Sequence, residues 1–231
     1  AVAALQTIQP ETGKFYTIAS ASVQNDDSRT GDMIYVDNAG VMHFADASAA
    51  LGNVFQFVDA GNGQFYLYNA LRNTYLNTAK GHGGGQETAI ATTTDAAVKV
   101  TITNLGCENI VKIVPENGAM LHAQVTNSVV VGWNNEAYDN GSAWRIVEVD
   151  PTTTSFDVTI SEAGYSTLYL GCDVTIPEGV VEAYTVTSLE NGEANLAAVE
   201  DAIPAKTAVI LKKAEGQPTD ATYKFNYAES A

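Results

Sequence analysis

The chain has 231 residues, and its 27 acidic and 11 basic side chains give a formal net charge of −16. This charge argues against a nucleic-acid partner, because phosphate binding requires clustered cations, and no run of about 18 apolar residues is present that would insert into a membrane. Apolar residues make up 45% of the chain and charged residues only 16%. Thr, Asn, Ser and Gly fill the remainder, and this composition favours pleated strands and turns, so we predict an all-β protein.

Three segments of the first 150 residues share one layout of four short strands. The predicted opening strands are 13–18, 63–68 and 109–114, the second strands 33–36, 75–77 and 120–123, the third strands 41–44, 88–91 and 129–133, and the closing strands 53–57, 96–100 and 142–146. The closing positions Phe55, Val98 and Trp144 recur at intervals of 43 and 46 residues. Twelve short strands are stable once they close into a capped barrel that has no exposed edges. We therefore predict a β-trefoil in which these three residues share one core layer.

The remaining residues follow a different pattern. Residues 151–154 read Pro-Thr-Thr-Thr, a short polar linker. Alternating apolar and polar residues then predict strands at 156–160, 166–170, 180–186, 208–211 and 222–227, separated by turns at 177–179, 190–193 and 216–218. Residues 196–202 are predicted to form one short helical turn. The expected organisation is two domains, a β-trefoil over residues 1–150 and a small β-sandwich over residues 151–231.

Two stretches carry a resemblance to known families. Residues 63–77 resemble the opening hairpin of the ricin-B-like trefoil lectins, and residues 129–146 resemble the second half of their repeat, which ends in a Gln-x-Trp motif. This resemblance covers about residues 10–150 and implies carbohydrate binding. Gly164, Tyr165 and Pro204, with their neighbours, resemble a small β-sandwich module of gut-bacterial surface proteins. That module implies a secreted or cell-surface protein whose signal peptide has been removed.

The predicted binding site lies mainly in the third repeat. The family's sugar site combines an aspartate of the second strand with an aromatic residue near the end of the third strand, and here the aspartate position holds Tyr35, Asn77 and His122. A sugar site needs an aromatic face together with groups that bind hydroxyls. The predicted ligand-binding residues are Trp133, Asn134, Asn135, Tyr138, Asp139 and Asn77. Ordinary packing of Trp133 remains the alternative, whereas Trp144 is expected to face the core.

No catalytic residues, metal site or cofactor are predicted. The segment that begins at His82 and continues with three glycines is similar to an oxyanion-hole loop, but the Gly-x-Ser-x-Gly motif that must accompany it is absent. The three histidines, His43, His82 and His122, fall at similar places in different repeats or in a loop, whereas nucleophilic catalysis needs a nucleophile with a base in reach and an orienting acid. The acidic stretches 26–27 and 37–40 lack EF-hand spacing.

The two cysteines, Cys107 and Cys172, are predicted to be free, buried thiols, because they belong to different predicted domains and to no zinc-binding pattern. The leading functional hypothesis is a non-catalytic carbohydrate- or glycoconjugate-binding module of an exported bacterial protein. One alternative is a structural or protein-interaction scaffold with degenerate sugar sites. Another is the accessory region of a secreted glycoside hydrolase.

Overall fold

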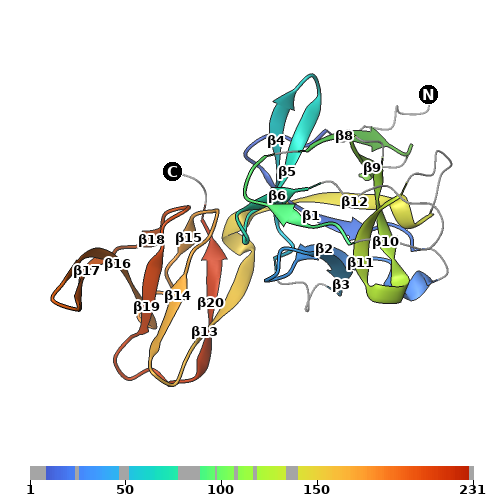
Figure 1. Cartoon of the computed structure of the whole chain (residues 1–231). Coiled ribbons are helices and arrows are strands. Elements are labelled where there is room, and N and C mark those ends of the chain that lie inside the picture. The colour runs from blue at the N-terminus through green and yellow to red at the C-terminus, as the bar shows by residue number, and fades with distance from the viewer. Residues whose placement is uncertain are drawn as a thin grey trace. The chain divides into compact units, whose positions relative to one another are not determined.

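The computed structural model describes residues 9–23, 26–46, 52–77, 89–96, 98–106, 109–116, 119–133 and 140–228. The chain divides into two compact units, residues 1–149 and residues 150–231 (Figure 1). The regular structure of the described residues consists of strands and four single-turn 3-10 helices, so the all-β prediction is confirmed. These short helices are η1 (Asp27–Arg29), η2 (Val125–Asn127), η3 (Asn140–Ser142) and η4 (Pro151–Thr153). In the described part of the chain, no helix is long and apolar enough to cross a membrane.

Six strands of the first unit form a closed antiparallel barrel. They are β1 (Phe15–Ser20), β4 (Phe55–Gly61), β5 (Gln64–Asn69), β8 (Lys99–Asn104), β9 (Ile110–Pro115) and β12 (Trp144–Val149). Each pairs with the next in this order, and β12 pairs with β1, so that Phe15 lies opposite Val149. The ring leaves no free edge among the six barrel strands.

Three hairpins cap this barrel. They pair β2 (Met33–Val36) with β3 (Met42–Ala45), β6 (Thr74–Leu76) with β7 (Thr92–Thr93), and β10 (Met120–Gln124) with β11 (Val129–Trp133). The hairpins join one another through three pairs, Val129 with His43, Val41 with Ala91, and Ala89 with Val131. A six-stranded barrel with three hairpin caps is a β-trefoil, so the predicted fold is confirmed. Of the strand predicted at 88–91, Ala89 and Ala91 form isolated bridges and residue 88 lies outside the described residues, and β7 begins one residue later.

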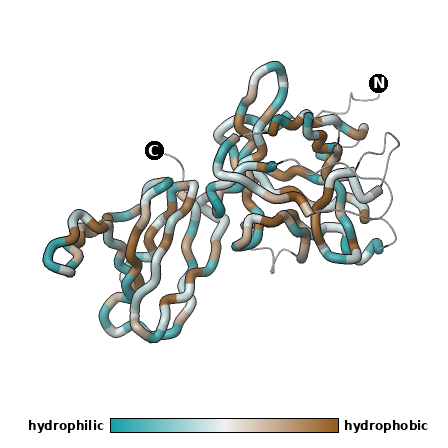
Figure 2. The backbone as a smooth tube through the Cα atoms, in the orientation of Figure 1, coloured by the Kyte–Doolittle hydropathy of each residue, from teal (hydrophilic) through white to brown (hydrophobic). Residues whose placement is uncertain are grey.

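One hydrophobic core fills the trefoil. Phe55, Val98 and Trp144 are all buried and belong to this one cluster, which confirms their predicted position in the core. The Trp144 side chain is fully buried, and its indole Nε1 donates a hydrogen bond of 2.9 Å to the carbonyl oxygen of Leu121. Figure 2 shows hydrophobic residues recurring along the strands and hydrophilic residues gathering in the turns of the unit.

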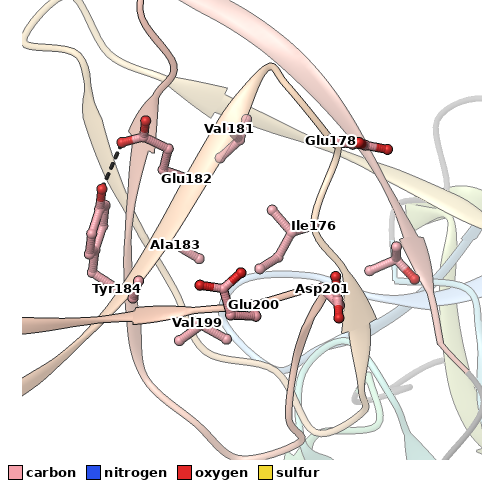
Figure 3. A pocket seen from close by; sticks show the side chains of 11 residues that line it. Ile176, Glu178, Val181, Glu182, Ala183, Tyr184, Val199, Glu200 and Asp201 are labelled. Atoms are coloured by element: carbon pink, nitrogen blue, oxygen red, sulfur yellow. Dashed lines mark hydrogen bonds between the residues drawn. The ribbon is translucent and has the colours of Figure 1, made fainter.

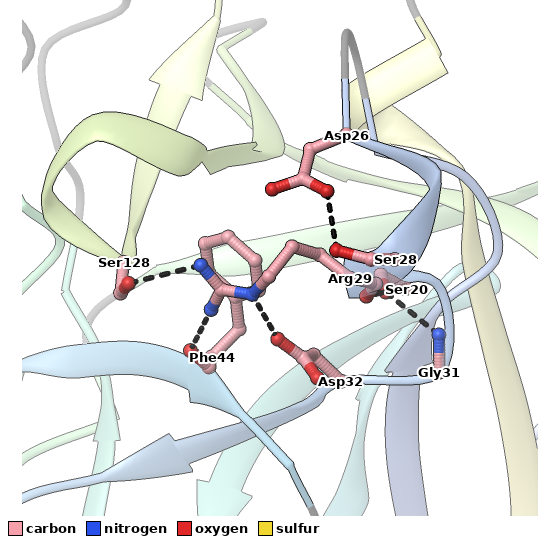
Figure 4. A network of polar contacts seen from close by, with 8 residues as sticks. All are labelled: Ser20, Asp26, Ser28, Arg29, Gly31, Asp32, Phe44 and Ser128. Atoms are coloured by element: carbon pink, nitrogen blue, oxygen red, sulfur yellow. Dashed lines mark hydrogen bonds and ion pairs between the residues drawn. The ribbon is translucent and has the colours of Figure 1, made fainter.

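Arg29 ties two of the caps together (Figure 4). Its Nη2 donates to the carbonyl oxygen of Phe44 at 3.0 Å, its Nη1 donates to Ser128 Oγ at 3.1 Å, and its Nε pairs with Asp32. The guanidinium also lies 4.4 Å from the centroid of the Phe44 ring, within the range of a cation–π contact. These contacts link the first repeat to the third.

The second unit contains two four-stranded antiparallel sheets. One has the order β13 (Ser155–Ile160), β20 (Ala221–Tyr227), β15 (Val174–Thr175), β18 (Ala202–Ile203), and the other the order β14 (Tyr165–Leu168), β19 (Val209–Lys213), β16 (Val181–Glu190), β17 (Glu193–Val199). Alternate residues of β20 and β19, such as Phe225 and Leu211, are buried. Each sheet therefore has one apolar face, as the layers of a β-sandwich require. The helical turn predicted at 196–202 is wrong, because residues 196–199 belong to β17, Ala202 begins β18, and only Glu200 and Asp201 lie between the two strands.

Cys172 lies free and buried in the second unit, whereas Cys107 is outside the described residues. Burial, assisted by the charge of Asp173, raises the pKa of the Cys172 thiol to about 12. Because the thiolate is the reactive form, we expect Ellman's reagent to modify Cys172 very slowly in the native protein at pH 8. In guanidinium, without prior reduction, two thiols per chain should react.

The raised pKa also fixes the direction of a pH effect. The folded state holds the thiol proton more tightly than the unfolded state, so the stability due to neutral Cys172 is complete below pH 9 and is lost as the pH rises toward 12. Rapid modification of native Cys172 at pH 8 would contradict its burial.

Candidate functional site

Hydrogen bonds between the caps define which residues of the three repeats are equivalent. Met42 N donates to the carbonyl oxygen of Ile90, and Ile90 N donates to that of Val130, both at 2.8 Å. These three residues thus occupy one position of the pseudo-threefold arrangement. The next residues, His43, Ala91 and Val131, are equivalent in the same way. Across the hairpins they face a second shared position, held by Tyr35, Asn77 and His122: Tyr35 pairs with His43, Asn77 N donates to the carbonyl oxygen of Ala91, and His122 pairs with Val131. This is the position that the sequence comparison of the repeats assigned to the lectin aspartate.

In the third repeat, a tryptophan stacks on a buried histidine. The ring centroids of Trp133 and His122 are 4.8 Å apart, and the planes are inclined by 20°. His122 is 5% exposed, and its Nδ1 lies 3.0 Å from Oγ of the buried Ser142. Gly141 passes so close to the imidazole that any Cβ at that position would collide with it. The histidine is therefore fixed on several sides and supports the indole from beneath.

Trp133 itself is half-buried at the C-terminal end of β11. Its Nε1 is buried and has no hydrogen-bond partner within the described residues. The other predicted members of this site, Asn134, Asn135, Tyr138 and Asp139, lie outside the described residues. Of the predicted residues in this loop, the structure thus describes Trp133 alone and shows how its indole is held.

The second repeat holds a cluster of tyrosines that the sequence analysis overlooked. Tyr75 lies 4.8 Å from Tyr68 and 6.4 Å from Tyr66, measured between ring centroids. Tyr66 and Tyr75 are half-buried, and Asn77, which follows Tyr75 by two residues on the same face of the chain, is exposed. The signal was available in the sequence as tyrosines spaced two apart in the opening strand. Asn77 therefore has aromatic neighbours, although they come from the first and second strands instead of the third.

In the first repeat, the carboxylate of Asp37 forms its hydrogen bonds within its own hairpin. Its Oδ1 accepts hydrogen bonds from the backbone N–H groups of Ala39 and Val41, both at 2.9 Å, and its Oδ2 lies 3.0 Å from His43 Nε2. Partial burial opposes ionisation of Asp37, but these hydrogen bonds outweigh it and hold the pKa of the carboxyl below its ordinary value. Tyr35 stacks on His43 at 5.4 Å. The acidic stretch at 37–40 is thus a turn held by an aspartate, and no cluster of metal-binding side chains exists among the residues the structure describes.

The pair of Ser142 and His122 is the nearest approach to a nucleophile with a base in the described part of the trefoil. Ser142 is fully buried, and Trp133 covers one face of His122. A nucleophile must be accessible to its substrate, so this pair contributes to packing. The segment around His82 lies outside the described residues.

No protein-family model and no curated protein match the chain. Among solved structures, it is similar to ThreeFoil, a designed 3-fold symmetric protein, with 15% identity and a TM-score of 0.46 over 58% of this chain and 99% of that one. It is also similar to Polyporus squamosus lectin bound to the epitope Neu5Aca2-6Galb1-4GlcNAc, with 20% identity and a TM-score of 0.46 over 64% of this chain and 51% of that one. The BEL beta-trefoil matches with 10% identity and a TM-score of 0.47 over 63% and 99% of the two chains. The trefoil assignment itself rests on the strand pairing described above.

Proposed function

We propose that the trefoil unit is a non-catalytic carbohydrate-binding module and that Trp133 is the platform for a sugar ring. The observation that carries this proposal is the stacking of a half-buried indole on the buried, immobilised His122. An aromatic ring whose orientation is fixed before binding loses little entropy when a ligand stacks on it. Asn134, Asn135, Tyr138 and Asp139 follow directly in the sequence and supply the amides and the acid that such sites use for hydroxyl groups.

The second repeat offers a second, weaker location. Asn77 is exposed beside the half-buried Tyr75, so an amide and an aromatic edge are within reach of the same ligand. The ring of Tyr75 already packs against Tyr68 and Tyr66, which leaves less of it free to contact a ligand. We therefore assign the principal role to Trp133 and an auxiliary role to Asn77.

The test uses the two tryptophans of the chain. In a ¹⁵N-labelled sample they give two indole N–H signals, and Trp133→Phe identifies the signal of Trp133. A glycan array selects the sugars to titrate. We expect a selected sugar to shift the Trp133 signal and leave that of the buried Trp144 unchanged, with a Kd on the order of 1 mM, the weak affinity typical of stacking in a shallow site.

The decisive variant is Trp133→Ala, with Asn77→Ala as its companion. Trp133→Ala should abolish binding and lower the stability by about 1–2 kcal/mol, less than the roughly 3–5 kcal/mol of a core tryptophan, because the indole is only half-buried. Asn77→Ala should weaken binding only partly. If the wild-type chain bound no glycan on the array while Trp133→Ala lost as much stability as a core variant, Trp133 would be a packing residue.

One observation favours a second candidate function, a protein-interaction scaffold with degenerate sugar sites. His122 stands where the lectins carry an aspartate, and it is buried and bonded to Ser142, so it presents no hydroxyl-binding group at the surface. A chain that binds no glycan but retains its fold would support this alternative.

We further propose that the chain is exported and acts outside the cell or on its surface. The support is the resemblance of the segments around Tyr165 and Pro204 to a module of gut-bacterial surface proteins. Fractionation of the native organism's cells, with an antibody against this chain, tests the location. Recovery in the cytoplasmic fraction alone would contradict it.

A further inference from the structure

Strand β17 forms an open edge of its sheet. The sheet order places it outside β16, and every residue of β17 from Glu193 to Ala198 is exposed. Within the described residues, its only strand partner is β16. Natural edge strands are commonly protected by lysine or proline, and β17 contains neither. The edge is therefore available for pairing with another strand.

The turn before β17 determines which backbone groups face outward. Asn191 and Gly192 have φ values of 54° and 85°, the left-handed conformations of a two-residue hairpin turn. Glu190 and Glu193, which flank this turn, pair with each other and are the hydrogen-bonded pair that closes it. Since inward and outward groups alternate along an antiparallel strand, Ala194, Leu196 and Ala198 direct their N–H and C=O groups away from β16.

An apolar stripe runs along one face of this hairpin. Val186 pairs with Leu196 and Leu189 with Ala194, and a bulge in β16 between these pairs keeps all four side chains on the same face. Val186, Leu189 and Leu196 are 48%, 76% and 44% exposed. Hydrophobic colour marks this part of the hairpin in Figure 2 and gives way to hydrophilic colour at its turn. An exposed apolar stripe of this kind marks an interaction surface.

The C-terminal end of β17 borders an acidic pocket of about 600 Å³ (Figure 3). Ile176, Val181 and Val199 contribute apolar side chains to its lining, and the carboxylates are those of Glu178, Glu182, Glu200 and Asp201. Glu182 accepts hydrogen bonds from Tyr184 at 2.7 Å and from Lys212 at 3.2 Å, so its charge is compensated. The other three carboxylates have no ion pair within the described residues. An apolar lining with uncompensated acids suits the aliphatic stem and cationic head of Lys or Arg.

We propose that β17 binds a β-strand of a partner polypeptide by strand addition. Side chains of an added strand alternate between the two faces of the sheet. Apolar residues of the partner would extend the stripe of Val186, Leu189 and Leu196, and Lys or Arg residues would lie on the other face, one of them entering the acidic pocket. The net charge of −16, and the acids Glu190, Glu193 and Glu200 around the edge, favour a cationic partner over a second copy of this chain. This site lies in the second unit and goes beyond the proposed function of the trefoil.

The probe is the acetylated and amidated peptide Val-Lys-Val-Lys-Val-Lys-Val, whose lysines all lie on one side of a strand. Val-Glu-Val-Glu-Val-Glu-Val is the matched control for charge. Binding to the full chain is measured by isothermal titration at low salt, and ¹H–¹⁵N spectra locate it. We expect the lysine peptide to bind at least tenfold more tightly than the glutamate peptide and to shift the amide signals of Ala194, Leu196 and Ala198.

Two variants separate backbone pairing from charge. Ala198→Pro removes an N–H that faces away from β16, a replacement that edge strands tolerate, and should weaken binding at least tenfold, whereas Ala198→Val keeps the N–H and should bind as the wild type does. The double variant Glu200→Gln with Asp201→Asn should weaken binding by up to about fivefold per charge. Asn suits position 201 because it accepts the positive φ of 55° found there. Circular dichroism verifies that each variant is folded.

Three results would overturn the proposal. The first is no binding of the lysine peptide to the wild-type chain, and the second is equal binding of the two peptides. The third is a concentration-dependent dimer, seen in sedimentation velocity, that Ala198→Pro dissociates, because a second copy would then occupy the edge.

Discussion

Replacing Trp144 with alanine should destabilise the trefoil by about 3–5 kcal/mol, the usual cost of removing a fully buried tryptophan. The side chain is fully buried, and its loss leaves the Leu121 carbonyl without its indole donor. A domain stability is typically about 5–15 kcal/mol, so this one change removes a large part of it. Thermal unfolding followed by circular dichroism provides the measurement.

Trp144→Phe is the matched control. It keeps most of the apolar volume but removes the indole N–H, so its cost should be smaller and should reflect chiefly the unpaired carbonyl of Leu121, about 1–3 kcal/mol. The wild type should be the most stable of the three proteins, Trp144→Phe should be intermediate, and Trp144→Ala should be the least stable. If Trp144→Ala melted within about 2 °C of the wild type, the core position of this residue would be wrong.

Replacing Phe225 with alanine should unfold the second unit while leaving the trefoil folded. Phe225 is fully buried, and its ring stacks on that of Phe156 at 5.9 Å, so we expect a loss of about 3–5 kcal/mol. The two units can be observed separately in one sample. Both tryptophans lie in the first unit, and Cys172 lies in the second. Trp fluorescence should therefore keep its unfolding midpoint, whereas Cys172 should become reactive toward Ellman's reagent under native conditions.

Lys224→Ala is the control for this variant. Lys224 lies next to Phe225 in β20, and both side chains of its ion pair with Asp157 are exposed. Removing the Lys224 side chain should therefore lower the stability by less than about 1 kcal/mol. The contrary result is that Phe225→Ala lowers the stability reported by Trp fluorescence as much as it lowers the stability of the second unit. That result would mean that the two units unfold together and do not have independent cores.

The trefoil was predictable because its strands repeat along the sequence. The closing positions Phe55, Val98 and Trp144 recur at near-equal intervals, and each was expected in the core, where all three are found. Apolar spacing carries this information because every repeat buries the same face in a shared core. The short β7 was less predictable, since residues 88–91 alternate too weakly to distinguish a bridge from a strand.

The helical turn at 196–202 was mispredicted from local composition. Leu196, Ala197 and Ala198 are good helix formers, but Asn191-Gly192 is a strong hairpin signal that predicts strands directly on both sides. Pairing with β16 outweighs the weak helix propensity of these residues.

The candidate site was only partly predictable, because side chains distant in sequence define it. Trp133 was identified as an aromatic residue beside amides, but its support by His122, and the close approach of Gly141 that requires glycine there, depend on how the third repeat folds. Arg29 had no signature at all. Its partners Phe44 and Ser128 come from two different repeats, so no local pattern could reveal the link.

Closure of the barrel by β1 and β12 has a consequence for how the protein is made. Phe15 pairs with Val149, so the ring cannot close until almost the entire first unit has left the ribosome. At about 5–20 residues per second, synthesis of that length takes roughly 7–30 s. During this time β1 lacks the partner strand that later covers its edge, and its apolar residues stay accessible to chaperones. Contacts between residues distant in sequence also slow folding. The nascent trefoil should therefore remain unfolded long enough for a chaperone to bind it before the barrel closes.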